Sequence, residues 1–188
     1  MADLVISNRG APTLRNIRAI STPGLSFVES HGFSPDGRQI VFTGKKSGLS
    51  VVSDIYLLNL VSGKMSNITK QFGKAWNEHA QITPDGQSII WMTNNKTVSP
   101  NGRSRVGHAT DYWRMRINGS SPERLTHFDG MPGFAKRFNV ASDIDIHPGG
   151  KEAVCFVQTK LDKTGHIVRF TLPTNMGYIK RNRPGRWK

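Results

Sequence analysis

A turn followed by a short apolar run recurs three times along this chain. Each turn contains a proline and ends in glycine, and a polar pair separates it from the apolar run. The three turns span 33–37, 82–86 and 146–150, and the runs that follow begin at Ile40, Ile89 and Ala153. The turn prolines are 49 and 64 residues apart, against about 40–50 residues for one blade of a β-propeller. The pattern predicts a repeated β unit with an insertion in its second copy.

A second element follows each run. Short segments rich in aromatic and branched residues lie at 54–59, 111–116 and 165–170, each bounded by turn-forming residues, which is typical of strands. Proline presets one turn dihedral, aspartate bonds to its own turn and glycine accepts a positive φ. In the third turn Gly149 replaces the aspartate, and His147 replaces the Ser or Thr. We expect His147 to form a hydrogen bond within that turn.

One unit therefore has four antiparallel strands, which is a propeller blade. The sequence predicts an all-β fold, a partial β-propeller of about three such blades plus a half blade at the N-terminus. The expected propeller covers 1–179, with the half blade at 3–21, blades at about 30–70, 78–127 and 142–179, and a basic tail at 180–188. Six aromatic residues at equivalent positions predict packing between the sheets: Phe42, Tyr56, Trp91, Trp113, Phe156 and Phe170.

The segments 33–42 and 54–59 resemble the repeats of TolB-like β-propellers, which are relatives of the WD-repeat propellers. The resemblance covers the chain from Asp3 to about Pro173. It implies a propeller fold and a periplasmic location, although the first residues have neither the basic nor the long apolar region of a signal peptide. Members of this family include the periplasmic TolB protein, propeller domains of prolyl-oligopeptidase-like peptidases and some lyases, so the resemblance indicates several functions. Because such propellers usually have six or more blades, we expect a fragment, a dimer that closes the ring, or an arc docked on another protein.

The chain is strongly basic. It has 26 Lys and Arg residues against 13 Asp and Glu, a net charge of +13, which indicates an acidic partner such as a protein surface, an anionic membrane or nucleic acid. The contacts we expect come from two loops and the tail: Lys45, Lys46, Arg103, Arg105, Lys180, Arg181, Arg183, Arg186, Trp187 and Lys188.

Several polar residues precede the predicted first strand of each blade, which lines the central channel of a propeller. We expect five of them at the channel mouth: His31, Glu78, His79, Asp143 and Asp145. Imidazole and carboxylate groups are suitable ligands for a divalent metal. Polar lining of a wet channel is the alternative, and the sequence itself predicts neither a metal nor any other cofactor.

The sequence has no motif for a serine nucleophile or for phosphate binding. The chain contains no Gly-x-Ser-x-Gly nucleophile elbow and no glycine-rich phosphate loop,. Its single cysteine, Cys155, lies in an apolar run, so we expect a buried, unreactive thiol.

Three functions follow. The first is a non-enzymatic interaction or scaffold module, a propeller subunit that docks on a larger acidic or membrane-associated assembly. The second is a metal-assisted lyase or hydrolase with its site at the channel mouth. The third, less favoured by the sequence, is a propeller that binds nucleic acid through its basic loops.

Overall fold

A computed structural model describes residues 3–5, 12–48, 52–94, 109–134, 139–159 and 163–173. The first sheet has the strand order β3-β4-β5-β6, with β3 Phe27–Phe33, β4 Gln39–Lys45, β5 Asp54–Asn59 and β6 Met65–Asn67. A short 3₁₀ helix, η1, follows at Lys70–Phe72. In the second sheet the order is β10-β9-β8-β7, with β7 Asn77–Ile82, β8 Ser88–Thr93, β9 Asp111–Arg116 and β10 Glu123–Arg124. The third contains β11 Asn139–Ile146, β12 Glu152–Thr159 and β13 Gly165–Thr171.

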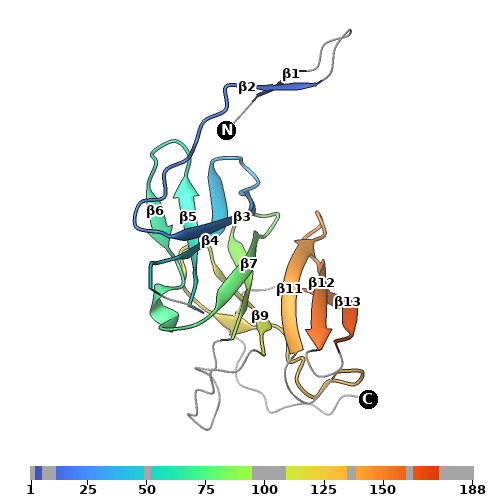
Figure 1. Cartoon of the computed structure of the whole chain (residues 1–188). Coiled ribbons are helices and arrows are strands. Elements are labelled where there is room, and N and C mark those ends of the chain that lie inside the picture. Colours follow the sequence, from blue (N-terminus) through green and yellow to red (C-terminus); the bar gives the residue numbers. More distant parts are fainter. Residues whose placement is uncertain are drawn as a thin grey trace.

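All neighbouring strands within these sheets are antiparallel. Figure 1 shows the sheets side by side, with β3, β7 and β11 as the first strands of successive sheets. Strand β7 contacts β3 and β4 on one side and β11 on the other. The predicted all-β class and the blade-like sheets are thereby confirmed. No helix in the described ranges has the length and apolar composition to cross a membrane.

The N-terminal strands β1 (Asp3–Val5) and β2 (Thr13–Arg15) form a separate antiparallel pair. In Figure 1 this hairpin extends from the end of the first sheet. Whether it belongs to a further blade stays a prediction.

The repeated turns form as the sequence predicts. In the second copy Thr83 donates a hydrogen bond of 2.6 Å to Asp85, whose carboxylate also accepts the Gln87 N–H, and Gly86 has a φ of +70°. In the third copy His147 Nδ1 accepts the Gly149 N–H at 3.0 Å, so the predicted role of His147 is confirmed. Consecutive turns lie close together, because a side chain added at Gly86 would come within 3.8 Å of the Pro35 ring in the first sheet's turn.

Two apolar cores separate the three sheets. Between the first and second sheets lie buried residues that include Ile55, Trp91 and Trp113. Between the second and third lie Tyr112, Phe128 and several others. Both faces of the second sheet are thus covered, which explains why every residue of β8 is buried.

The expectation for Phe156 is wrong. Counted from its turn proline, Cys155 is the residue that corresponds to Trp91 and Phe42, and it is buried. Phe156 is 37% exposed on the other face of β12, because a shift of one residue along a strand reverses the side of the sheet. Trp91 and Trp113 pack between the first two sheets as expected, and Phe170 is half-buried against Tyr112 of the second sheet. Phe42 and Tyr56 are buried, but in a cluster on the face of the first sheet that points away from the second sheet.

Cys155 supports a prediction about reactivity. Burial raises the pKa of its thiol to about 12, although a hydrogen bond with Tyr112 partly offsets this effect. At pH 8 the thiolate fraction is then about one in ten thousand, and the thiolate is the reactive form. We expect iodoacetamide to leave the native chain unmodified under conditions that alkylate the urea-unfolded chain fully, as measured by mass spectrometry. Equal rates in the two states would contradict the burial of Cys155.

Candidate functional site

The first strand of each of the three blade-like sheets carries a β-bulge at the same level. The register shifts lie between Ser30 and Gly32 in β3, between Glu78 and Gln81 in β7, and between Ala141 and Ile144 in β11. A bulge inserts one residue without a partner and changes the direction of its side chain. The residues in these bulges include His31, His79 and Asp143. We call these three bulges together the bulge layer.

His79 has an unusual backbone conformation. Its φ is +52°, in the left-handed region that side chains other than glycine seldom adopt,. Histidine is among the residues that tolerate this region better than most, but the conformation still costs free energy. Such strain persists where the surrounding structure holds it, and it is often found at functional sites.

His31 is anchored to the adjacent strand. Its Nε2 lies 2.6 Å from the hydroxyl of Thr43, which is fully buried in β4. Burial, followed by the charge of His79, lowers the pKa of His31 to about 4. The ring is therefore uncharged at neutral pH.

His79 connects the second and third sheets. Its Nδ1 lies 3.0 Å from Oδ1 of Asp143, which is an ion-pair distance when the ring is protonated, although the two groups are not aligned as a hydrogen bond. Ser142 lies 3.4 Å from Nε2 of the same ring. The Tyr112 hydroxyl donates hydrogen bonds to the backbone carbonyls of Ser142 and Asp143, so the bulge of β11 is fixed to the second sheet.

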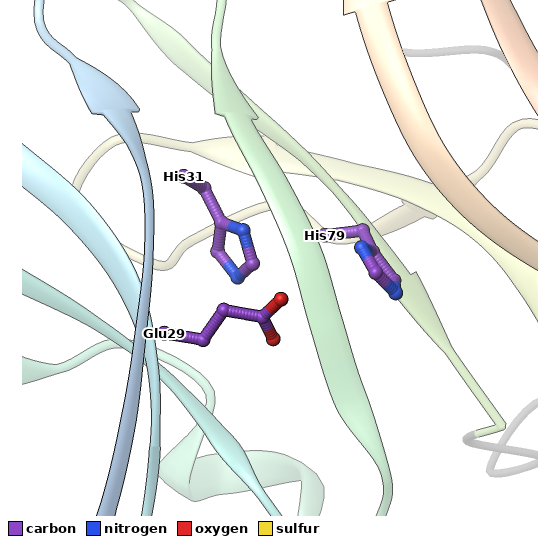
Figure 2. Close-up of side chains that lie close together, drawn as sticks. All are labelled: Glu29, His31 and His79. Atoms are coloured by element: carbon purple, nitrogen blue, oxygen red, sulfur yellow. The ribbon is translucent and has the colours of Figure 1, made fainter.

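Glu29 completes a group with the two histidines. One ligand atom each from Glu29, His31 and His79 lies within 4.8 Å of the others, and the two imidazole rings are 5.8 Å apart. Figure 2 shows the Glu29 carboxylate and both rings gathered beside β3 and β7. Glu29 is the more exposed member of the group, and the two histidines are half-buried. The group therefore has a buried side and a side open to solvent.

This arrangement has the composition of a divalent metal site. Two imidazoles and one carboxylate suit Zn²⁺ and similar transition metals better than Mg²⁺ or Ca²⁺, which prefer oxygen ligands. Metal-binding histidines commonly contact a second polar group as well, and here His31 contacts Thr43 and His79 lies beside Asp143. Three protein ligands would leave a coordination position for water or a ligand.

The structure refines the predicted channel-mouth residues. His31, Glu78, His79, Asp143 and Asp145 lie within the first strands, whereas the sequence placed them just ahead of those strands. The bulge layer brings His31, His79 and Asp143 together. Glu78 is nearby, with its carboxylate 3.8 Å from Nε2 of His79, and burial raises its pKa. Asp145 is exposed opposite Val154 in β12, and no described contact joins it to His79.

Sequence reasoning did not identify Glu29 or Thr43. Glu29 and His31 are two residues apart in one strand, a spacing that places side chains on the same face, so this signal was present in the sequence. Thr43 contacts His31 from the neighbouring strand, and this contact depends on the strand register.

Of the predicted basic contact residues, Lys45 and Lys46 lie in the part of the chain that the structure describes. Lys46 is exposed, whereas Lys45 is half-buried at the end of β4, where its charge partly offsets the rise that burial causes in the pKa of Glu78. The other residues lie outside the described part of the chain: Arg103, Arg105, Lys180, Arg181, Arg183, Arg186, Trp187 and Lys188.

Comparison with curated proteins finds two relatives. The chain is 30% identical over 107 residues to dipeptidyl-peptidase 5 of Porphyromonas gingivalis, a match that covers 54% of this chain and 14% of that protein. It is 34% identical over 96 residues to an uncharacterized protein of Agrobacterium fabrum, covering 51% of this chain and 27% of the relative. The chain therefore spans about a quarter or less of the curated relatives it matches. No protein-family model matches it.

Among solved structures, the β-propeller domain of the Trilobed protease from Pyrococcus furiosus is similar. It has a TM-score of 0.45 and 10% identity, and the match covers 80% of this chain and 44% of that chain. The class of protein follows from the described sheets themselves: the chain is a partial β-propeller, similar in sequence to part of a dipeptidyl-peptidase.

Proposed function

We propose that this chain is a propeller module that binds one divalent transition-metal ion through Glu29, His31 and His79. The observation that supports this proposal is the bulge layer, which brings ligand atoms from β3 and β7 within 4.8 Å of one another. Thr43 and Asp143 would orient the two imidazoles. The bound ion would hold an anionic ligand at its open position, or polarise an oxygen atom of a substrate.

The lyase or hydrolase predicted from the sequence would need such an ion. Glu78 would then be the nearest additional carboxyl group, since it lies beside His79 and its pKa is raised by burial. A carboxyl group with a raised pKa is suited to proton transfer near neutral pH. Metal binding does not by itself require catalysis, so metal binding is tested first.

The test is a titration of chelator-treated protein with Zn²⁺ and Mn²⁺ by isothermal calorimetry, with Mg²⁺ for comparison. We expect one saturable site per chain for at least one transition metal and much weaker binding of Mg²⁺. The absence of saturable binding for both transition metals would overturn the proposal.

A second candidate function is the docking module, a TolB-like propeller subunit. The outer face of the third sheet favours it, because Val154, Phe156 and Ile167 are 43%, 37% and 79% exposed there. These apolar side chains lie on the adjacent strands β12 and β13. Between the first and second sheets, apolar side chains of this kind are covered by the neighbouring sheet. We propose that another propeller sheet, from a second copy or a partner protein, covers this face.

Replacing Ile167 with aspartate tests this docking. Since the side chain is 79% exposed, the substitution should change the free energy of unfolding by no more than about 0.5 kcal/mol. We expect it to abolish any concentration-dependent association seen by light scattering, whereas Val61→Asp, at another highly exposed apolar residue, should leave association intact. If the wild type and Ile167→Asp associate equally, this face is not the docking surface.

A further inference from the structure

Basic side chains surround an open cavity on the first sheet. The cavity has a volume of about 660 Å³. Tyr56, Met65 and Leu25 are among its apolar lining residues, and they form a cluster on the face of the sheet that points away from the second sheet. We call it the Tyr56 pocket.

Three lysines line the same cavity. Lys46 follows β4, whereas Lys70 and Lys74 lie in and after η1, which follows β6. Because β5 lies between β4 and β6, the lysines approach the pocket from both sides of Tyr56. All three are exposed, and none forms a salt bridge with another described residue.

The one carboxylate of the pocket is already engaged. Asp54 accepts hydrogen bonds from Asn67 Nδ2 at 2.8 Å and from the Thr69 hydroxyl at 3.0 Å. Its oxygens are thus occupied by neutral donors, and three lysines against this one carboxylate leave the pocket with an excess of positive charge over an apolar floor.

We propose that the Tyr56 pocket docks an acidic polypeptide segment, with one apolar side chain seated beside Tyr56 and flanking carboxylates facing Lys46, Lys70 and Lys74. This inference concerns a different surface from the metal site. It rests on the proposed docking function only in taking the partner to be a protein. Charge complementarity between an acidic segment and the lysines supplies orientation and association rate. Burial of an apolar side chain supplies affinity that salt does not screen.

The sheet edge favours a polypeptide over a nucleic acid. Strand β6, which contributes Met65 and Asn67 to the pocket, is the outermost strand of its sheet and lies at the margin of the body in Figure 1. An extended peptide that leaves the pocket can therefore pair with a strand edge. A phosphate backbone instead needs a continuous basic stripe, and here apolar residues separate Lys46 from the other two lysines.

The test uses fluorescein-labelled peptides and fluorescence anisotropy, with a chelator present so that the metal site does not contribute. One probe has a single leucine flanked on each side by glutamates, the second has glutamate in place of leucine, and the third is a single-stranded DNA of equal charge. We expect the leucine probe to bind at least about 10-fold more tightly than the other two, since roughly 1.4 kcal/mol corresponds to tenfold in affinity.

The double variant Lys46→Glu/Lys70→Glu should weaken leucine-probe binding by at least about 10-fold. Its control is Arg116→Glu/Lys151→Glu, which makes the same change of net charge at exposed basic residues of the second and third sheets, outside the pocket. The control should retain binding within about threefold, because distant exposed charges are screened, and thermal melting confirms that both variants fold.

Three results would overturn the proposal: no binding of the leucine probe, equal loss in the control variant, or DNA binding as tight as that of the leucine probe. A fourth would be self-association of the chain that only the pocket variant abolishes, since a second copy would then be the occupant. None of these results bears on the metal titration, so the two proposals fail separately.

Discussion

Metal affinity falls by at least about 100-fold when His79 is replaced by asparagine, because the change removes one of three ligands. Asparagine tolerates a positive φ better than most residues, so this variant keeps the backbone conformation at φ +52° while the imidazole is lost. We expect the same loss for His31→Gln, whose amide can still reach the Thr43 hydroxyl. Calorimetric titration with the transition metal that the wild type binds measures both effects.

The matched control is His147→Asn. His147 is exposed in the third turn, where its ring accepts the Gly149 N–H, and asparagine can accept the same hydrogen bond. This variant removes an imidazole from the chain but leaves the bulge layer unchanged. If it lost metal affinity as His79→Asn does, the site would not be the one described.

Loss of the Trp91 side chain destabilises the fold by about 3–5 kcal/mol in the variant Trp91→Ala, as for other buried tryptophans. Trp91 is fully buried between the first two sheets, and its indole N–H donates a hydrogen bond of 3.0 Å to Asn77. The conservative variant Trp91→Phe keeps most of the packing but leaves the Asn77 oxygen without this donor, which costs about 1–3 kcal/mol. Urea denaturation followed by circular dichroism measures the free energies of unfolding.

Phe33→Ala is the control for this series, since Phe33 is 63% exposed. Phe33→Ala should lower the free energy of unfolding by much less than either Trp91 variant, because the exposed aromatic surface is in contact with water in both the folded and the unfolded chain. A similar cost for Phe33→Ala and Trp91→Ala would mean that Trp91 does not lie in a core between sheets. Since a loss of 5 kcal/mol can unfold a small domain, Trp91→Phe keeps the comparison measurable if Trp91→Ala does not fold.

The sequence predicted the sheets and their turns well because both depend on local chemistry. Residues such as Asp85 and Gly86 set the turn geometry within a few positions, and strand alternation placed Trp91 and Trp113 in the core. The error at Phe156 has the same origin. Strand alternation is so strict that an offset of one residue moved the aromatic to the exposed face,.

The candidate site was predicted only in part because it depends on the bulges. No glycine or proline marks the bulge at His79, and its positive φ has no local sequence signal. The sequence suggested His31, His79 and Asp143 from their place in the repeat, but it could not show that the bulges bring them together. The contacts made by Thr43 and Tyr112 join different strands or sheets, so they depend on the folded register.

The most direct test of the metal site is paramagnetic broadening of the histidine ring signals in two-dimensional NMR spectra of the whole chain. Each histidine is assigned by a single substitution. Mn²⁺ is then added in small amounts to chelator-treated protein, or Co²⁺ where calorimetry shows that the site binds Zn²⁺ but not Mn²⁺. We predict that the signals of His31 and His79 broaden first, while those of His147 and His166, on the third sheet's turn and last strand, stay sharp. Equal broadening of all four histidines, or none for His31 and His79, would contradict a metal site in the bulge layer.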